Sequence, residues 1–217
     1  MPAPDTQILS RVVMLQTADR AGAGFVVDRR KRKWLVTASH VVPDEQVLEL
    51  DLVFATGRSS TALTRLPAVP RAADIAVFAL EADDVDAHGD LELSNAGLLM
   101  GQEVHLFGYP LIGYGNWRTD TGGTLPFIRS GCMGGTMSQA GTRMLLVDAL
   151  SDAGMAGGPV TFAHDRKGKA HVAGVIIDPD AGGGGTSPAV VPHFPLGITQ
   201  VASIDHVNDT IDAWKGR

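Results

Sequence analysis

The amino-acid sequence predicts an all-β protein, built as an antiparallel sandwich or barrel. Two observations support this prediction: short apolar runs rich in β-branched residues recur at intervals of roughly 8–20 residues, and no long amphipathic helical pattern separates them. Gly, Pro, Asp and Asn lie between the runs, as expected for turns. The runs are RVVML, GFVV, KWLVTASHVV, VLELDLVFA, DIAVFAL, EVHLFGY, RMLLVDAL, PVTFA and HVAGVII.

One helix is predicted, near the end of the sequence. Apolar residues recur there at helical spacing, and Ser203 precedes them as a candidate N-cap. The apolar residues are Ile204, Val207, Ile211 and Trp214. We expect this helix to dock its apolar stripe on the β-structure.

Composition favours a soluble, globular chain. Its 217 residues are 44% hydrophobic, enough for a large core, and carry a net charge of −6. The charge gives no general affinity for nucleic acid or anionic membranes, and no apolar run approaches the roughly 18 residues of a spanning helix. The single cysteine, Cys132, allows no internal disulfide. Together with the lack of a visible secretory signal, this favours a cytoplasmic location.

The stretch DRRKRK, residues 28–33, is a strongly basic cluster. Such clusters occur in nucleic-acid and nuclear-import patches. This one lies between two strand-like runs, GFVV and WLVTASHVV, where a hairpin tip is expected. We therefore interpret it as the solvent-exposed tip of a β-hairpin.

Among the seven histidines, His40 has the most suggestive position. It follows the run WLVTAS and begins a polar turn, where a histidine can act as a general base, although a structural histidine is the commoner outcome there. The others are expected at surface or sheet-edge positions, because no HExxH or paired His/Cys spacing indicates a metal site. They are His88, His105, His164, His171, His193 and His206. No metal or cofactor is predicted.

Asp74 directly precedes the run IAVFAL and would place its carboxylate at the entrance of a strand. An isolated aspartate there is most often a turn or capping residue. A buried carboxylate is also what a serine-activating histidine needs to hold the right tautomer. The interest of Asp74 therefore lies in its combination with His40.

The stretch GMAGGPV, residues 154–160, reads as a glycine-lined turn that leads into a strand. Gly154 permits a backbone conformation closed to residues with a Cβ, and the amides at 154 and 156 could converge on one point. Two converging amides form an oxyanion hole, which stabilises the charge that develops in acyl transfer. Taken alone, the stretch fits an ordinary glycine-rich hairpin better.

Seven short motifs follow one another in a recognisable order over about residues 10–215. They are GAGFVV, TASHVV, DIAVFAL, GQEVHLFGYP, VDALSDAGMAGGPV, HVAGVIID and GITQVASIDHVNDTIDAW. In this order they resemble the motifs of the trypsin-like (chymotrypsin-fold) serine proteases, most closely the disulfide-free bacterial HtrA-like and glutamyl-endopeptidase-like branch. The resemblance implies a single peptidase domain over 1–217. It implies two six-stranded antiparallel Greek-key β-barrels, at about 8–95 and 100–202, and a C-terminal helix over 203–215.

The resemblance also implies roles for individual residues. His40 falls on the catalytic base, Asp74 on its orienting carboxylate and Ala156 on the nucleophilic serine. The amides of Gly154 and Ala156 fall on the oxyanion hole. The implied protein is a serine endopeptidase that acts on protein or peptide substrates without a cofactor.

Ala156 departs from the family pattern, because a methyl group cannot form an acyl-enzyme. Two interpretations follow. Either a Ser→Ala change has inactivated an endopeptidase, which the intact His40 and Asp74 favour, or the protein is a natural pseudoprotease that binds peptides or partner proteins without cleaving them. A small-molecule esterase is disfavoured, because the open cleft of this fold suits extended peptides.

Two further departures concern regulation and specificity. Met155 stands where digestive members have an aspartate that pairs with a newly cut N-terminus, so we expect regulation by a protein partner instead. Leu150 falls at the base of the specificity pocket, and Ile177 and Asp178 begin its wall. The pocket base is not acidic, which favours a small or medium apolar P1 residue, while Asp178 leaves a basic preference open.

Overall fold

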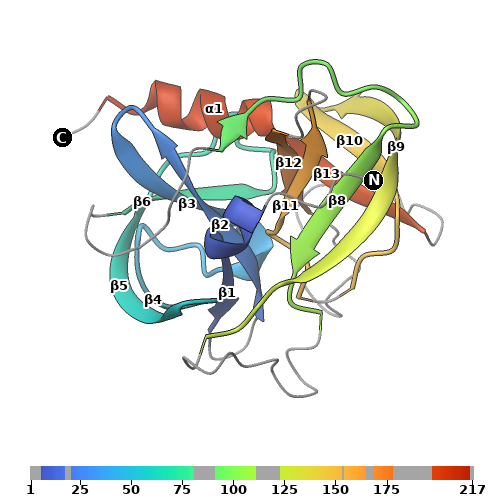
Figure 1. The fold of residues 1–217 in the computed structure, drawn as a ribbon. Helices are drawn as coiled ribbons and strands as arrows, with labels where there is room; N and C mark the ends of the chain where they lie inside the picture. The colour runs from blue at the N-terminus through green and yellow to red at the C-terminus, as the bar shows by residue number, and fades with distance from the viewer. Residues whose placement is uncertain are drawn as a thin grey trace.

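The computed structural model describes residues 6–17, 21–80, 91–110, 123–152, 154–164, 169–177 and 197–215. Two β-barrels lie side by side, and a helix crosses one side of both (Figure 1). The helix contacts strands of each barrel. No helix among the described residues is long and apolar enough to cross a membrane.

Six antiparallel strands close the first barrel. They are β1 (Val12–Gln16), β2 (Ala21–Arg29), β3 (Arg32–Ala38), β4 (Val47–Phe54), β5 (Gly57–Arg65) and β6 (Ile75–Leu80). Their order around the barrel is β1-β2-β3-β6-β5-β4, and β1 pairs with both β2 and β4. Two short 3-10 helices accompany them, η1 (Thr6–Ser10) before β1 and η2 (Ser39–Val41) after β3.

The second barrel has the same number of strands. They are β8 (Glu103–Gly108), β9 (Phe127–Gln139), β10 (Thr142–Asp148), β11 (Pro159–Ala163), β12 (Ala170–Ile176) and β13 (Ile198–Ser203). Their order is β11-β8-β9-β10-β13-β12, and pairing of β11 with β12 closes the ring. The two-residue β7 (Glu92–Leu93) adds to β12 in parallel. The predicted fold class is thereby confirmed.

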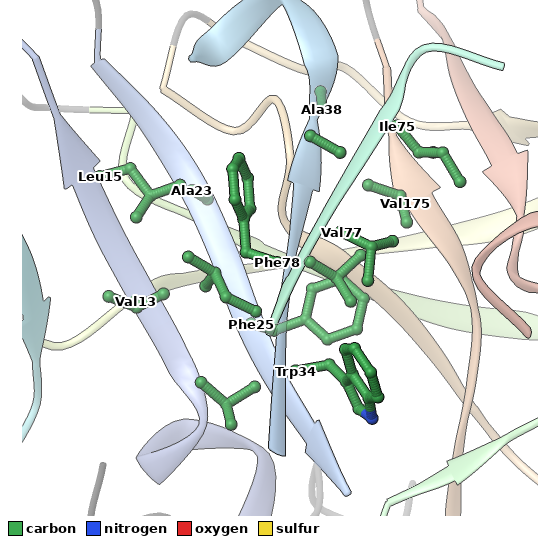
Figure 2. Packing of buried hydrophobic residues seen from close by; sticks show 14 of the residues in the cluster. Val13, Leu15, Ala23, Phe25, Trp34, Ala38, Ile75, Val77, Phe78 and Val175 are labelled. Carbon is green, nitrogen blue, oxygen red and sulfur yellow. The ribbon is translucent and has the colours of Figure 1, made fainter. Parts of the chain in front are cut away.

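The core of the first barrel is apolar and extends into the contact between the barrels. Figure 2 shows Phe25, Trp34 and Phe78 among the buried side chains, all fully shielded from solvent. Val175 of β12 belongs to the same buried cluster as Ile75 of β6. Burying such side chains stabilises the fold by about 1.5–3 kcal/mol each. The two barrels therefore share part of one core.

The C-terminal helix α1 (Ile204–Ala213) forms where it was predicted. Ser203 is its N-cap, and the Ser203 side chain accepts a hydrogen bond from the Asp205 amide. The apolar stripe faces inward, with Val207 and Ile211 fully buried. Trp214 follows the helix and meets the Trp34 ring edge-on, with the ring centroids 5.2 Å apart.

The basic stretch 28–33 forms the predicted hairpin tip. Arg30 and Lys31, with φ of 54° and 60°, make the two-residue turn between β2 and β3. The turn lies against α1, because Arg29 and Arg30 both form ion pairs with Asp212. Hydrogen bonds from Arg29 hold the pKa of the Asp212 carboxyl below its usual value. Two arginines of the basic cluster thus pair with one carboxylate of the helix.

Two strands, β5 and β9, have no counterpart among the predicted apolar runs. Their sequences, GRSSTALTR and FIRSGCMGGTMSQ, are rich in Gly, Ser and Thr, and most of their side chains are exposed or half-buried. Both are held by main-chain ladders on two sides, β5 between β4 and β6 and β9 between β8 and β10. Because ladder hydrogen bonds use only the main chain, these strands need no apolar signature.

The surface or edge placement expected for two histidines is wrong. His206, on the inner face of α1, is 5% exposed, and the Arg143 amide donates a 2.8 Å hydrogen bond to its Nε2. Burial lowers the pKa of His206. His171 of β12 is 9% exposed and stacks on the His164 ring, with centroids 4.3 Å apart. His88 and His193 lie outside the described residues.

Candidate active site

His40 and Asp74 lie together at one end of the first barrel. His40 belongs to η2, directly after β3, and Asp74 directly precedes β6. Antiparallel pairing of Ala38 with Ile75 brings these two strand ends side by side. The sheet register therefore places residues 34 positions apart in contact.

The Asp74 carboxylate engages His40 through both of its oxygens. The His40 amide donates to Oδ1 at 3.1 Å, and the ring Nδ1 lies 2.6 Å from Oδ2. The Ser39 amide donates to the Asp74 carbonyl at 3.2 Å. With the proton on Nδ1 facing the carboxylate, Nε2 is the basic nitrogen of the neutral ring. The side chains of His40 and Asp74 are 33% and 17% exposed, so the pair is only partly accessible to water.

The glycine-lined turn at 154–158 is held between the two barrels. The Ala23 amide of β2 donates to the Ala156 carbonyl at 2.8 Å. On the other side, the Gly157 amide donates to the Ile176 carbonyl at 2.8 Å, and the Ile176 amide donates to the Gly158 carbonyl at 2.9 Å. Main-chain bonds from both barrels thus position Ala156.

Close approach to this turn demands glycine on both barrels. A Cβ at Gly22 would lie 2.7 Å from the Val41 side chain and 2.9 Å from the Ala156 carbonyl oxygen. A Cβ at Gly157 would lie 2.2 Å from Thr37 Oγ1. The turn at 156 therefore packs directly on the segment 37–41, which carries His40.

The main chain around Ala156 has the form that the sequence suggests. Gly154 and Gly157 both have positive φ, 93° and 85°. The Gly154 carbonyl accepts from the Tyr109 amide at 2.9 Å. Within the part of the chain that the structure describes, the amides of Gly154 and Ala156 donate to no acceptor. Their use as an oxyanion hole stays a prediction that this arrangement allows.

The residues assigned to the specificity pocket differ in their environments. Leu150 lies after β10 and is 56% exposed, whereas Ile177 follows β12 and is 4% exposed. Asp178 lies outside the described residues. The assignment of Leu150, Ile177 and Asp178 to substrate binding stays a prediction.

Three residues near the site were not predicted from the sequence to have a role there. Arg129 of β9 donates to the Leu150 carbonyl at 3.2 Å and forms an ion pair with Asp152, just before the glycine turn. The Tyr109 hydroxyl donates to the Val12 carbonyl across the two barrels, and burial raises its pKa. The third is Arg65, at the end of β5. Of the three, only Tyr109 lies in one of the sequence motifs, GQEVHLFGYP, which could have drawn attention to it.

Residues 22–170 match the family model described as "Trypsin-like peptidase domain", and the chain belongs to this family. Its fold is shared by solved protease structures. The inactive form of a Ser-to-Ala mutant of Rv3671c from M. tuberculosis H37Rv superposes with a TM-score of 0.63 at 17% identity, covering 94% of this chain and 86% of that one.

Two other solved structures have the same fold. The HtrA-type protease AlgW with tripeptide superposes with a TM-score of 0.64 at 16% identity, over 96% of this chain and 61% of that chain. The serine endoprotease from Yersinia pestis gives a TM-score of 0.62 at 16% identity, over 98% and 66%. At these identities the likeness shows the fold alone. No curated protein is significantly similar to this chain.

Proposed function

We propose that this protein is built as a serine endopeptidase, with His40 as the general base, Asp74 as its orienting carboxylate and position 156 as the nucleophile. The observation that carries the proposal is the 2.6 Å contact between His40 Nδ1 and Asp74 Oδ2, beside the turn that holds residue 156. Membership of the trypsin-like peptidase family supports the same reaction class.

In this mechanism a serine hydroxyl at 156 attacks the carbonyl carbon of the scissile peptide bond. His40 Nε2 takes the hydroxyl proton and returns it to the leaving amine, while Asp74 keeps Nδ1 protonated and stabilises the imidazolium. The amides of Gly154 and residue 156 donate to the oxyanion. Water then attacks the acyl-enzyme in place of the amine. His40 Nε2 takes a proton from the water and returns it to the serine oxygen, which is the leaving group.

With alanine at 156 the same site binds a peptide but has no nucleophile. Loss of the nucleophile in a related mechanism costs on the order of 10⁶ in rate. We therefore propose that this protein, with alanine at 156, is inactive as a protease.

A second candidate function is that of a natural pseudoprotease, which binds peptides or partner proteins through the same face. The specific observation in its favour is Ala156 itself, a buried residue, 4% exposed, whose methyl group stands where a nucleophile would be needed. The intact His40 and Asp74 pair favours the first proposal, because a site without chemistry has no need of a base.

The experiment is the Ala156→Ser variant, incubated with a diverse peptide library and analysed by mass spectrometry. We expect cleavage by this variant and none by the parent protein or by Ala156→Ser combined with His40→Ala. The cleaved bonds would also give the P1 preference. If a folded Ala156→Ser variant cleaves nothing while the parent binds library peptides, the pseudoprotease function is the correct one.

A further inference from the structure

A single arginine clamps the turn that carries His40. Arg65 is the last residue of β5, and its side chain is only 12% exposed. Its Nη2 donates to the Ser39 hydroxyl, and its Nη1 donates to the Pro43 carbonyl at 3.0 Å and lies 3.0 Å from Asp44 Oδ1. The guanidinium carbon lies 6.0 Å from the centre of the Phe78 ring. One guanidinium therefore joins the two sides of His40.

This turn lies between two strands, and its main chain takes no part in a β-ladder, although Val41 and Val42 pack into the core. β3 ends at Ala38 and β4 begins at Val47, so residues 39–46 have no ladder partner. Buried main-chain groups outside ladders must find other partners. Asp74 accepts from the amides of Ser39 and His40, which secures the entry to the turn. Arg65 secures its exit through the carbonyl of Pro43.

The strand geometry places Arg65 for this task. Arg65 pairs with Phe78 in the β5–β6 ladder, and its amide donates to the Gln46 carbonyl at 2.9 Å. Its side chain therefore starts from a fixed main chain and extends over a buried ring. An arginine has a planar fork of donors that can hold two acceptors in one geometry, which a lysine ammonium does not reproduce.

We infer that Arg65 is a positioning residue for His40, acting through the turn 39–44; the inference rests on the proposed function. Without the fork, the Ser39 hydroxyl and the Pro43 carbonyl lose their shared partner. The turn then loosens, and the His40 ring moves relative to Asp74 and residue 156. A displacement of about 1 Å at a reacting group lowers a rate by on the order of 100-fold.

The first test uses the protein with Ala156 and does not depend on cleavage. A ring proton in a 2.6 Å bond between Nδ1 and a carboxylate gives a far-downfield proton NMR signal, which His40→Ala would assign by its loss. We expect Arg65→Met to broaden or abolish this signal through exchange with water. Arg58→Met is the matched control, because Arg58 is an exposed arginine of the same strand, and it keeps the signal.

The second test measures kinetics in the Ala156→Ser background. We expect Arg65→Met to lower kcat by tenfold or more with little change in KM, and Arg65→Lys to restore less than half of the loss. Full recovery by Arg65→Lys would mean that charge and not the fork matters, and would overturn the inference. An inactive Ala156→Ser parent rejects the proposed function but leaves the NMR result valid.

A milder variant covers the case in which Arg65→Met does not fold. Ser39→Ala removes one acceptor of the clamp and leaves the salt bridge of Arg65 with Asp44 in place. We expect a weaker downfield signal in Ser39→Ala at an unchanged near-UV circular dichroism spectrum. An unchanged signal in folded Arg65→Met would show that His40 is held without Arg65. An unchanged signal in folded Ser39→Ala would show that the bond between Arg65 and Ser39 does not position the His40 ring, and would overturn that part of the inference.

Discussion

The amide of Ala23 donates a 2.8 Å hydrogen bond to the carbonyl of Ala156, and this bond ties the first barrel to the glycine turn of the second. Ala23 lies in β2, beside the strand that leads to His40. The chemical groups proposed for catalysis thus come from two barrels that a main-chain hydrogen bond joins at the site itself.

Gly157 is a position where this contact between the barrels leaves no room for a side chain. A Cβ there would lie 2.1 Å from the Ala23 carbonyl oxygen, at a φ of 85°. We expect Gly157→Ala to lower the free energy of unfolding by about 3 kcal/mol or more, from crowding plus the left-handed backbone. Gly141→Ala is the matched control, with a φ of 79° and open space around the added Cβ, and should cost about 1 kcal/mol. Urea denaturation of the two variants gives the comparison, and equal losses would contradict it.

His206 predicts a pH dependence of stability. Burial lowers its folded-state pKa below the value of 6.5 in an unfolded chain. Well above pH 6.5 the ring is neutral in both states, and His206 then causes no loss of the unfolding free energy. As the pH falls below 6.5, the unfolded chain binds the proton first, so stability decreases by up to about 1.4 kcal/mol per pH unit until the folded-state pKa is reached.

The measurement is urea unfolding of the parent protein and of His206→Gln at several pH values between 7.5 and 5. The variant is expected to lose less stability over this range than the parent. Parallel curves would show that His206 does not contribute to the acid sensitivity.

Trp214 fastens the end of α1 to the first barrel. Its ring meets the buried Trp34 edge-on at 5.2 Å, and the Arg32 guanidinium lies 5.1 Å from the ring centre. We expect Trp214→Ala to lower the unfolding free energy by about 2 kcal/mol, from lost burial and aromatic contact. Lys215→Ala, at the exposed next residue, should change it by less than about 0.5 kcal/mol. Thermal unfolding followed by near-UV circular dichroism reports both.

The hairpin turn offers a stabilising substitution. Lys31 is exposed and adopts a φ of 60°, which a side chain disfavours by about 1–2 kcal/mol and glycine does not. We expect Lys31→Gly to raise the unfolding free energy by about 0.5–1 kcal/mol. Arg58→Gly, within β5, should instead lower it by a similar amount. The denaturation midpoints of the two variants, compared at equal slopes, measure the two changes in unfolding free energy. A loss of stability at both positions would contradict the strain expected at Lys31.

The apolar runs and the capped helix could be predicted because their signals are local. A run such as IAVFAL forms a buried strand by its own composition, and Ser203 caps the helix through the amide of Asp205, two residues away. The order of the motifs also singled out His40, Asp74 and Ala156 together. The contact between His40 and Asp74, however, depends on the pairing of β3 with β6, and no local sequence pattern predicts that pairing.

The strands β5 and β9, the buried His206 and the clamp of Arg65 illustrate what local patterns miss. Both strands carry polar and small side chains and exist because their neighbours offer complete ladders. His206 looks like a surface residue of a helix until β10 brings the Arg143 amide to its ring.

By itself, the sequence determined which segments become strands with apolar faces, where the helix begins, and which residue types are present for acyl transfer. The tertiary structure alone decided that Asp74 meets His40, that the turn at 156 lies against the segment 37–41 that carries this histidine, and that Arg65 contacts both sides of it. The physical reason is the separation along the chain of the residues that interact. Burial patterns and caps act over a few residues, whereas these contacts join segments that only the closure of two barrels brings together.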